Sequence, residues 1–180
     1  MIYLSILPIV IYLIFVYVKY GLQKSISESY YKLTRKEKPL FFFALVLTSM
    51  FMIVSYGIEN AGTINALVLF FAGSGICYTA AASQFKSGNI TESVHVVGAV
   101  GGYVLGYIFI GIEHKFESLF FIIPSLLLIV IIHLIEKSKE DRQHLYNLSA
   151  ELTDIKVYVN KSIWWAEIIG FLTIYLSIIL

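Results

Sequence analysis

The chain has 180 residues, of which 58% are hydrophobic and 14% are charged, and its formal net charge is +1. Soluble domains carry about 25% charged residues, so this composition excludes an ordinary soluble domain, and the near-neutral charge gives no support for binding to nucleic acid. Several runs of about twenty residues carry almost no charge, which is the length needed to cross ~30 Å of hydrocarbon. The sequence therefore predicts an all-α integral membrane protein with a single domain over residues 1–180.

Six apolar runs are expected to form transmembrane helices. They cover approximately residues 2–18, 39–57, 63–83, 94–112, 118–135 and 162–180. Only residues 58–62 separate the second run from the third, and only residues 113–117 separate the fourth from the fifth. Connections this short join antiparallel neighbours, so we expect a bundle that contains two helical hairpins.

Lysine and arginine residues are distributed very unevenly between the two sides of this expected bundle. Twelve of them flank or link the runs on one side, and Lys115 stands alone on the other. The positive-inside rule then predicts that the basic links lie in the cytoplasm and that both termini lie outside.

The link between the fifth and sixth runs is the longest. In it Leu145, Leu148, Leu152, Ile155 and Val159 recur at steps of three or four, and polar residues stand between them. This period is typical of an amphipathic helix, which we expect to lie at the membrane interface or across the cytoplasmic ends of the bundle. The alternative is a frayed continuation of the fifth helix.

A few polar residues are candidates for chemistry on the basic side. The stretch Lys24–Lys38 is the most polar segment of the N-terminal half, and His95, His133 and Glu167 lie near run ends on the same side. An acid about two turns inside an apolar run costs a few kcal/mol unless it is paired, protonated or hydrated, so Glu167 is the strongest single candidate. Each has a simpler explanation as well: either histidine can be an interfacial or capping residue, and Glu167 can be a structural partner of a neighbouring helix.

Glycines mark one face of the fourth run. Gly98, Gly102 and Gly106 recur every fourth residue, and His95 precedes them on the same stripe. Small residues at this spacing let another helix approach closely, either within the chain or in a homo-oligomer.

The order of several short motifs resembles a known family. Ser25-Ile26-Ser27 with Tyr30-Tyr31 follows the first run, Ala72-Gly73-Ser74-Gly75 lies in the third, and His95 with Gly98-Ala99 opens the fourth. This pattern, over roughly the first 110 residues, is similar to an uncharacterised bacterial family of six-helix membrane proteins, domain of unknown function family nine-nine-eight. That family is distantly similar to DRAM-type and Frag-type membrane proteins. The resemblance implies a six-helix bundle of the bacterial inner membrane with no established activity.

Together these observations predict a polar pocket on the basic side, with the segment Ser25–Tyr31 as a lid. The favoured interpretation is a non-catalytic protein, or one of unassigned activity, that binds a membrane lipid, another lipid-like amphiphile or a partner there, without a cofactor. The expected ligand-binding residues are Ser25, Ser27, Glu28, Tyr30, Tyr31, His95 and Glu167. Two alternatives stay open: a hydrolase or transferase that uses a transition metal held by His95, His133 and Glu167, and a small proton-coupled transporter.

Overall fold

The computed structural model describes residues 5–82, 88–149 and 158–180. The described residues form α-helices and one short 3-10 turn. In chain order these are α2 (Leu7–Tyr20), α3 (Ile26–Lys32), α4 (Lys38–Glu59), α5 (Ile64–Ala82), α6 (Gly88–His114), η1 (Lys115–Ser118), α7 (Leu119–Ser149) and α8 (Ser162–Ile179). The prediction of an all-α chain is confirmed over these ranges.

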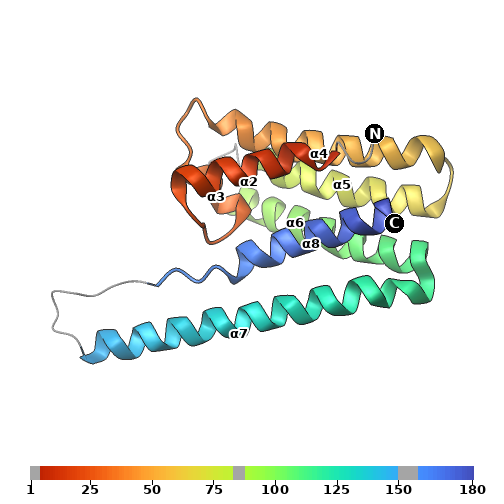
Figure 1. Cartoon of the computed structure of the whole chain (residues 1–180). Coiled ribbons are helices and arrows are strands. Elements are labelled where there is room, and N and C mark those ends of the chain that lie inside the picture. Colours follow the sequence, from red (N-terminus) through yellow and green to blue (C-terminus); the bar gives the residue numbers. More distant parts are fainter. Residues whose placement is uncertain (1–4, 83–87, 150–157) are drawn as a thin grey trace.

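Several of the helices are long and apolar enough to cross a membrane. Four such stretches are Lys38–Glu59, Ile64–Ala82, Val94–His144 and Ser162–Ile179. The third contains most of α6 and of α7, which are separated by η1 and run in opposite directions (Figure 1). Helix α2 is also apolar but has only 14 residues, and residues 2–4 of the first predicted run lie outside the described ranges. These helices indicate a multi-pass membrane location.

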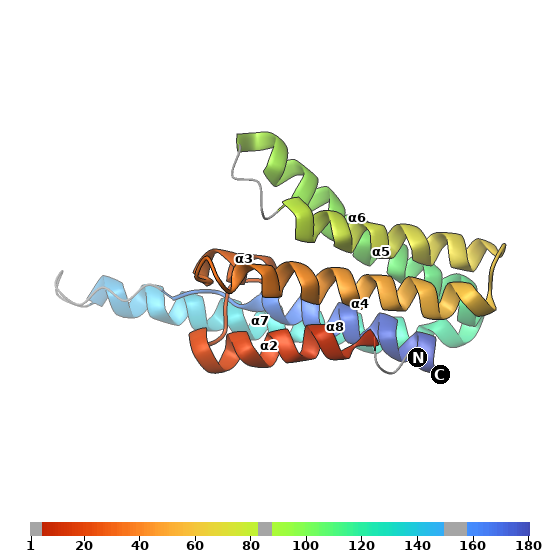
Figure 2. The same cartoon turned by 90° about the horizontal axis from the view of Figure 1, so that it is seen from above.

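The long helices lie side by side along one direction, so the molecule has two ends (Figures 1 and 2). The basic end carries the segment Gly21–Glu37, the last turns of α7 and the start of α8. The hairpin end carries the turns at Asn60–Thr63 and Lys115–Ser118 together with the end of α8. Helix α4 packs between α2 and α5, α5 packs along α6, and α8 packs against α6 and α7.

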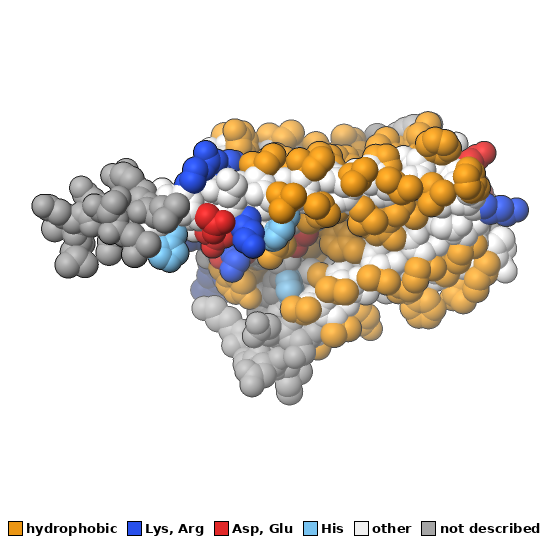
Figure 3. Space-filling view, turned by 90° about the horizontal axis from the view of Figure 1, so that it is seen from below, with side chains coloured by type: hydrophobic (Ala, Val, Ile, Leu, Met, Phe, Trp, Pro, Cys, Tyr) orange, Lys and Arg blue, Asp and Glu red, His pale blue; other side chains and the backbone are white. Residues whose placement is uncertain are grey.

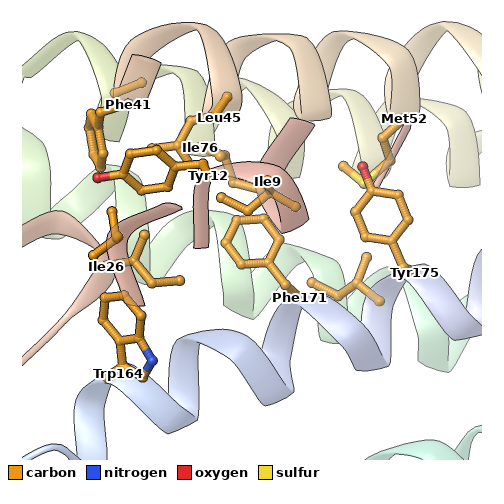
Figure 4. Close-up of a cluster of buried hydrophobic side chains, with 14 of the residues drawn as sticks. Ile9, Tyr12, Ile26, Phe41, Leu45, Met52, Ile76, Trp164, Phe171 and Tyr175 are labelled. Carbon is orange, nitrogen blue, oxygen red and sulfur yellow. The ribbon is translucent and has the colours of Figure 1, made fainter. Parts of the chain in front are cut away.

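Large aromatic side chains form the centre where α2, α4 and α8 meet (Figure 4). Phe41 and Tyr175 are almost completely buried there. The Tyr175 hydroxyl donates a hydrogen bond of 2.9 Å to the carbonyl oxygen of Thr48, whose own hydroxyl accepts one of 3.2 Å from the Ile9 amide. These buried polar groups of α2, α4 and α8 therefore pair across helices, which satisfies them where water is absent.

Glycine allows α5 and α6 to approach each other closely. A Cβ atom added at Gly75 would lie 2.7 Å from the Gly98 carbonyl oxygen, and one at Gly102 would lie 3.1 Å from the Ala72 carbonyl oxygen. Gly106 faces a different neighbour, because a Cβ there would meet the Ile174 side chain of α8. The glycine stripe thus packs against other helices of the same chain.

One predicted element differs from the structure. Helix α7 continues to Ser149 instead of ending near Ile135. The first residues of the expected amphipathic helix therefore continue the fifth run, as the alternative interpretation had it. The middle of that stripe, including Leu152 and Ile155, lies outside the described residues, and Val159 is in a non-helical segment. A separate helix that begins at Leu145 is therefore wrong for its first residues, because no glycine or proline interrupts residues 136–149 to break the preceding helix.

The surface is divided in the way that a membrane requires. Seen from below, hydrophobic side chains cover the length of the molecule, while lysine, arginine, acidic and histidine side chains gather mainly toward one end (Figure 3). Large apolar residues stand exposed along this belt, for example Val97 at 70% and Phe120 at 75%. Apolar exposure on this scale marks a membrane-facing surface.

Candidate functional site

The segment Ser25–Tyr31, expected as a loop, is mostly the short helix α3. Ser25 has an extended backbone and its side-chain oxygen accepts a hydrogen bond of 3.0 Å from the Glu28 amide. This is N-capping, which satisfies one of the free amides in the first helical turn. The spacing Ser25-x-x-Glu28 is the sequence pattern of a capping box and could have predicted the helix.

Glu167 binds the start of this helix. Its Oε2 accepts a hydrogen bond of 2.5 Å from the amide of Ile26, the first residue of α3. A backbone hydrogen bond lies next to it: the Trp164 amide donates to the Lys24 carbonyl oxygen at 3.0 Å. A carboxylate at a helix N-terminus also interacts favourably with the helix dipole. Helix α8 therefore holds α3 in place by a side chain and by a main-chain bond.

Tyr103 of α6 holds Glu167 from the other side. Its hydroxyl donates to the Glu167 carbonyl oxygen at 3.0 Å, and its ring stacks edge-on against Phe171 with centroids 5.5 Å apart. Gly170 leaves room for this ring, since a Cβ there would lie 2.7 Å from it. The position of Glu167 is thus fixed by α6 as well as by α3.

The inner face of α3 is buried against α2 and α4. Ser29 is fully buried and hydrogen-bonds through its hydroxyl to that of Tyr12. Tyr30 packs on Phe41, with ring centroids 5.5 Å apart, and the Lys38 ammonium lies 4.6 Å from the Tyr30 ring centroid. Such packing holds α3 at the end of the bundle, near the start of α4 (Figure 2).

The predicted ligand residues of this segment therefore divide into two groups. Ser27 and Tyr30 are buried, with exposed fractions of 9% and 6%, whereas Tyr31 is exposed at 61%. Ser25 and Glu28 are half-buried and are joined by the cap described above. Only the outer residues of α3 are accessible to a ligand in this arrangement.

The two candidate histidines have separate partners. His95 Nδ1 lies 3.2 Å from the Thr79 carbonyl oxygen of α5, and His133 Nδ1 lies 3.4 Å from the Ser162 hydroxyl at the start of α8. Glu167 contacts Ile26 instead. Over the described ranges, no three His, Cys, Asp or Glu side chains are grouped closely enough to hold a metal ion.

An apolar groove lies between α2 and α8 at the basic end. It has a volume of about 350 Å³. It is lined by Leu13, Ile14, Tyr17, Leu22, Trp164, Trp165 and Ile168. Lys24 and Lys161 adjoin it through the backbone, because the Trp164 amide bonds to Lys24 and the Trp165 amide bonds to the Lys161 carbonyl oxygen at 3.3 Å. The main chain of these two lysines therefore lies beside the apolar groove at one edge of the bundle.

An ion pair fixes the rest of the basic loop. Glu37 accepts hydrogen bonds from the Lys19 ammonium, from the Tyr20 hydroxyl at 2.6 Å and from the Thr34 hydroxyl at 2.7 Å. These bonds, with the one from Lys19 strongest, lower the pKa of the Glu37 carboxyl to about 2. Lys19 is thereby paired, whereas the side chains of Lys24, Lys32 and Arg35 are exposed to the surroundings.

A polar group at the hairpin end was not predicted from sequence. Glu113 of α6 accepts hydrogen bonds from the Tyr56 hydroxyl of α4 and, at 2.5 Å, from the Asn65 amide of α5. Glu113 stands beside a short turn in the sequence, where a charged residue is normally solvated, and only the position of Asn65 inside an apolar run signalled a partner.

The sequence matches no protein-family model, no curated protein and no solved structure. The resemblance to the uncharacterised six-helix family therefore stays a prediction.

Proposed function

We propose that the chain is a six-span membrane protein that binds an anionic phospholipid at its basic end. The acyl chain would occupy the groove between α2 and α8, and the phosphate would lie near Lys24 and Lys161. The observation that carries this proposal is that Trp164 joins the groove to Lys24. Its side chain lines the apolar groove, and its amide donates a hydrogen bond to the Lys24 carbonyl oxygen.

The helix lengths and directions support six crossings. In addition to α4, α5 and α8, the Val94–His144 stretch supplies two antiparallel crossings in α6 and α7. Helix α2 would supply the sixth, because its described part runs alongside α4 and its Tyr12 and Ile9 are buried in the bundle.

The chemistry of the groove fits an anionic lipid. Its wall is apolar and aromatic, which suits an acyl chain, and tryptophan is favoured at the level of lipid headgroups. Each lysine near an anionic membrane surface contributes about 1 kcal/mol of attraction. The exposed side chains of Lys24 and Arg35 leave cations available to a headgroup at this end.

Lipid retention by charge variants tests the proposal. Protein with both Lys24→Gln and Lys161→Gln is reconstituted in nanodiscs of phosphatidylglycerol and phosphatidylcholine, extracted in mild detergent and examined by native mass spectrometry. Because about 1 kcal/mol is lost per lysine, and so about 2 kcal/mol in the double variant, we expect the retained phosphatidylglycerol to fall roughly thirtyfold while phosphatidylcholine is unchanged.

Lys115→Gln is the matched control, since Lys115 is exposed at the hairpin end. Ile168→Trp, which fills the groove without changing charge, should displace both lipids. Equal retention of phosphatidylglycerol by the double variant, the control and the wild type would refute the proposed site.

A further inference from the structure

A second cavity opens at the hairpin end, far from the basic end. It has a volume of about 640 Å³, which is enough for a small organic ligand. Its lining comes from the last turns of α4, α6 and α8. The polar members are Ser55, Tyr56, Glu59, Asn60, Glu113, His114 and Ser177.

Glu113 presents a fixed carboxylate to this cavity. Tyr56 and Asn65 both donate to its Oε2, so two neighbouring helices set the orientation of the carboxylate. Among the described residues no hydrogen bond to Oε1 is observed, which leaves that oxygen as an acceptor. Both donors are neutral, and the lining holds no lysine or arginine, so the negative charge has no cationic partner within the cavity wall.

His114 supplies a second fixed group. Its Nε2 lies 2.5 Å from the Ser177 carbonyl oxygen, and its ring packs on Phe121 with centroids 5.2 Å apart. Because a carbonyl oxygen can only accept, Nε2 carries the hydrogen. The cavity thus offers the Glu113 carboxylate as an acceptor, beside an imidazole ring that is held in a fixed orientation.

The rest of the wall is apolar. Ile58, Ile178 and Ile179 line the cavity beside these polar groups. A ligand that matches it needs several N–H donors, a positive charge and an apolar body. A primary ammonium provides three donors and the charge together.

We propose that this cavity is a binding site for a small primary amine with an apolar body. The ammonium donates to Glu113 Oε1, and the apolar body lies against Ile58, Ile178 and Ile179. This site is separate from the lipid groove at the basic end, so either proposal can fail without the other.

Calorimetric titration with benzylamine tests the site. The full chain is placed in nanodiscs of phosphatidylcholine alone, which removes binding of the amine to anionic lipid. We expect saturable binding of benzylamine, and binding of benzyl alcohol and of benzoate that is weaker by about tenfold or more. Benzyl alcohol has a single donor and no positive charge to pair with the carboxylate, and benzoate carries the same charge as the carboxylate.

Variants locate the binding. Glu113→Gln should weaken benzylamine about tenfold or more, and Glu117→Gln, a nearby exposed acid outside the cavity lining, should leave it unchanged. Ile178→Trp fills the apolar part without changing a polar group and should also abolish binding, which keeps the test decisive if Glu113→Gln does not fold. Equal binding of amine and alcohol, or benzylamine binding that survives both variants, would overturn the proposal.

Discussion

At the scale of single residues, Glu167 joins two segments that are 141 positions apart in the chain. Its carboxylate replaces the hydrogen bond that the amide of Ile26 would otherwise make with water. Loss of a charged acceptor from a buried amide costs about 1–3 kcal/mol. Loss of the Glu167 carboxylate should therefore lower the stability of α3 more than that of the rest of the bundle.

We expect Glu167→Ala to loosen α3, whereas Glu167→Gln should do so much less, since the glutamine side-chain oxygen can still accept from Ile26. Hydrogen exchange measured by mass spectrometry should show faster exchange in peptides that cover Ile26–Lys32 for the alanine variant. Thr173→Ala is the control, because the Thr173 hydroxyl donates to the carbonyl oxygen of Ile169 in its own helix. Unchanged exchange of α3 in Glu167→Ala would contradict this role.

Glu37 gives the fold a defined dependence on acid. Its pKa is about 2 in the folded chain, and the ordinary value of a glutamate is about 4.3. A carboxyl whose folded pKa is depressed stabilises the fold above the unfolded pKa, and this contribution disappears as the pH falls from about 5 toward 2.

The thermal midpoint of wild-type protein in detergent should therefore fall more between pH 6 and pH 3 than that of Glu37→Gln, which has no charge to lose. Glu117→Gln, exposed at the other end, should behave like the wild type. Parallel curves for wild type and Glu37→Gln would show that the Lys19–Glu37 pair does not contribute.

Sequence reasoning singled out Glu167 for a physical reason, because an acid inside an apolar run needs a partner. It could not identify Ile26 as that partner, since any of the backbone amides at the basic end could have filled this role. The sequence did not single out Glu113, because a charged residue beside a tight turn normally faces water and needs no partner. Only its contacts with Tyr56 and Asn65, on two other helices, distinguish it.

At the scale of elements, hydrophobic run lengths predicted the long helices well, since the cost of exposed backbone in lipid leaves few alternatives. Run lengths did not predict α3, whose seven residues include two tyrosines and two serines. They also did not predict where α7 ends. Its 31 residues span ~46 Å, longer than the ~30 Å hydrocarbon core. We expect its last turns to project from the membrane, because the charged residues of this helix begin at Glu136.

The packing of α5 on α6 yields a test with an internal control. Gly98→Ala should destabilise the fold, because its Cβ would lie 2.8 Å from the Gly75 carbonyl oxygen and backbone cannot move aside easily. Overpacking of this kind costs about 1–3 kcal/mol. Gly101→Ala, three positions on, meets no atom within 4 Å and should be neutral or slightly stabilising, since alanine favours a helix.

The measurement is the thermal midpoint of each variant in the same detergent. Gly106→Ala should lie between the two, because the atom its Cβ meets is the end of the flexible Ile174 side chain. If Gly98→Ala were as stable as Gly101→Ala, the close approach of the two helices would not depend on glycine.

At the scale of the whole molecule, the two ends differ in charge and in the chemistry they offer. The basic end combines exposed lysines with an apolar groove, and the hairpin end combines fixed acceptors with a cavity. The sequence predicted the first of these ends from twelve lysine and arginine residues against one. The second depends on contacts among α4, α5, α6 and α8, which no local pattern encodes.

The two ends should lie on opposite sides of the membrane, because three crossings, α4, α5 and α6, separate Lys36 from Glu117. Both residues are exposed, and Cys77 is the single native cysteine. Lys36→Cys and Glu117→Cys, each made in a Cys77→Ala background, therefore report one end each when intact cells are treated with a membrane-impermeant maleimide.

The lysine and arginine bias predicts that Glu117→Cys is labelled in intact cells and that Lys36→Cys is labelled only after the membrane is permeabilised. Cys77→Ala alone is the background control. Labelling of Lys36→Cys alone in intact cells would reverse the orientation but keep the three crossings. Labelling of both positions from one side would contradict the three crossings. The hairpin-end cavity and the lipid groove would then lie on the same side of the membrane.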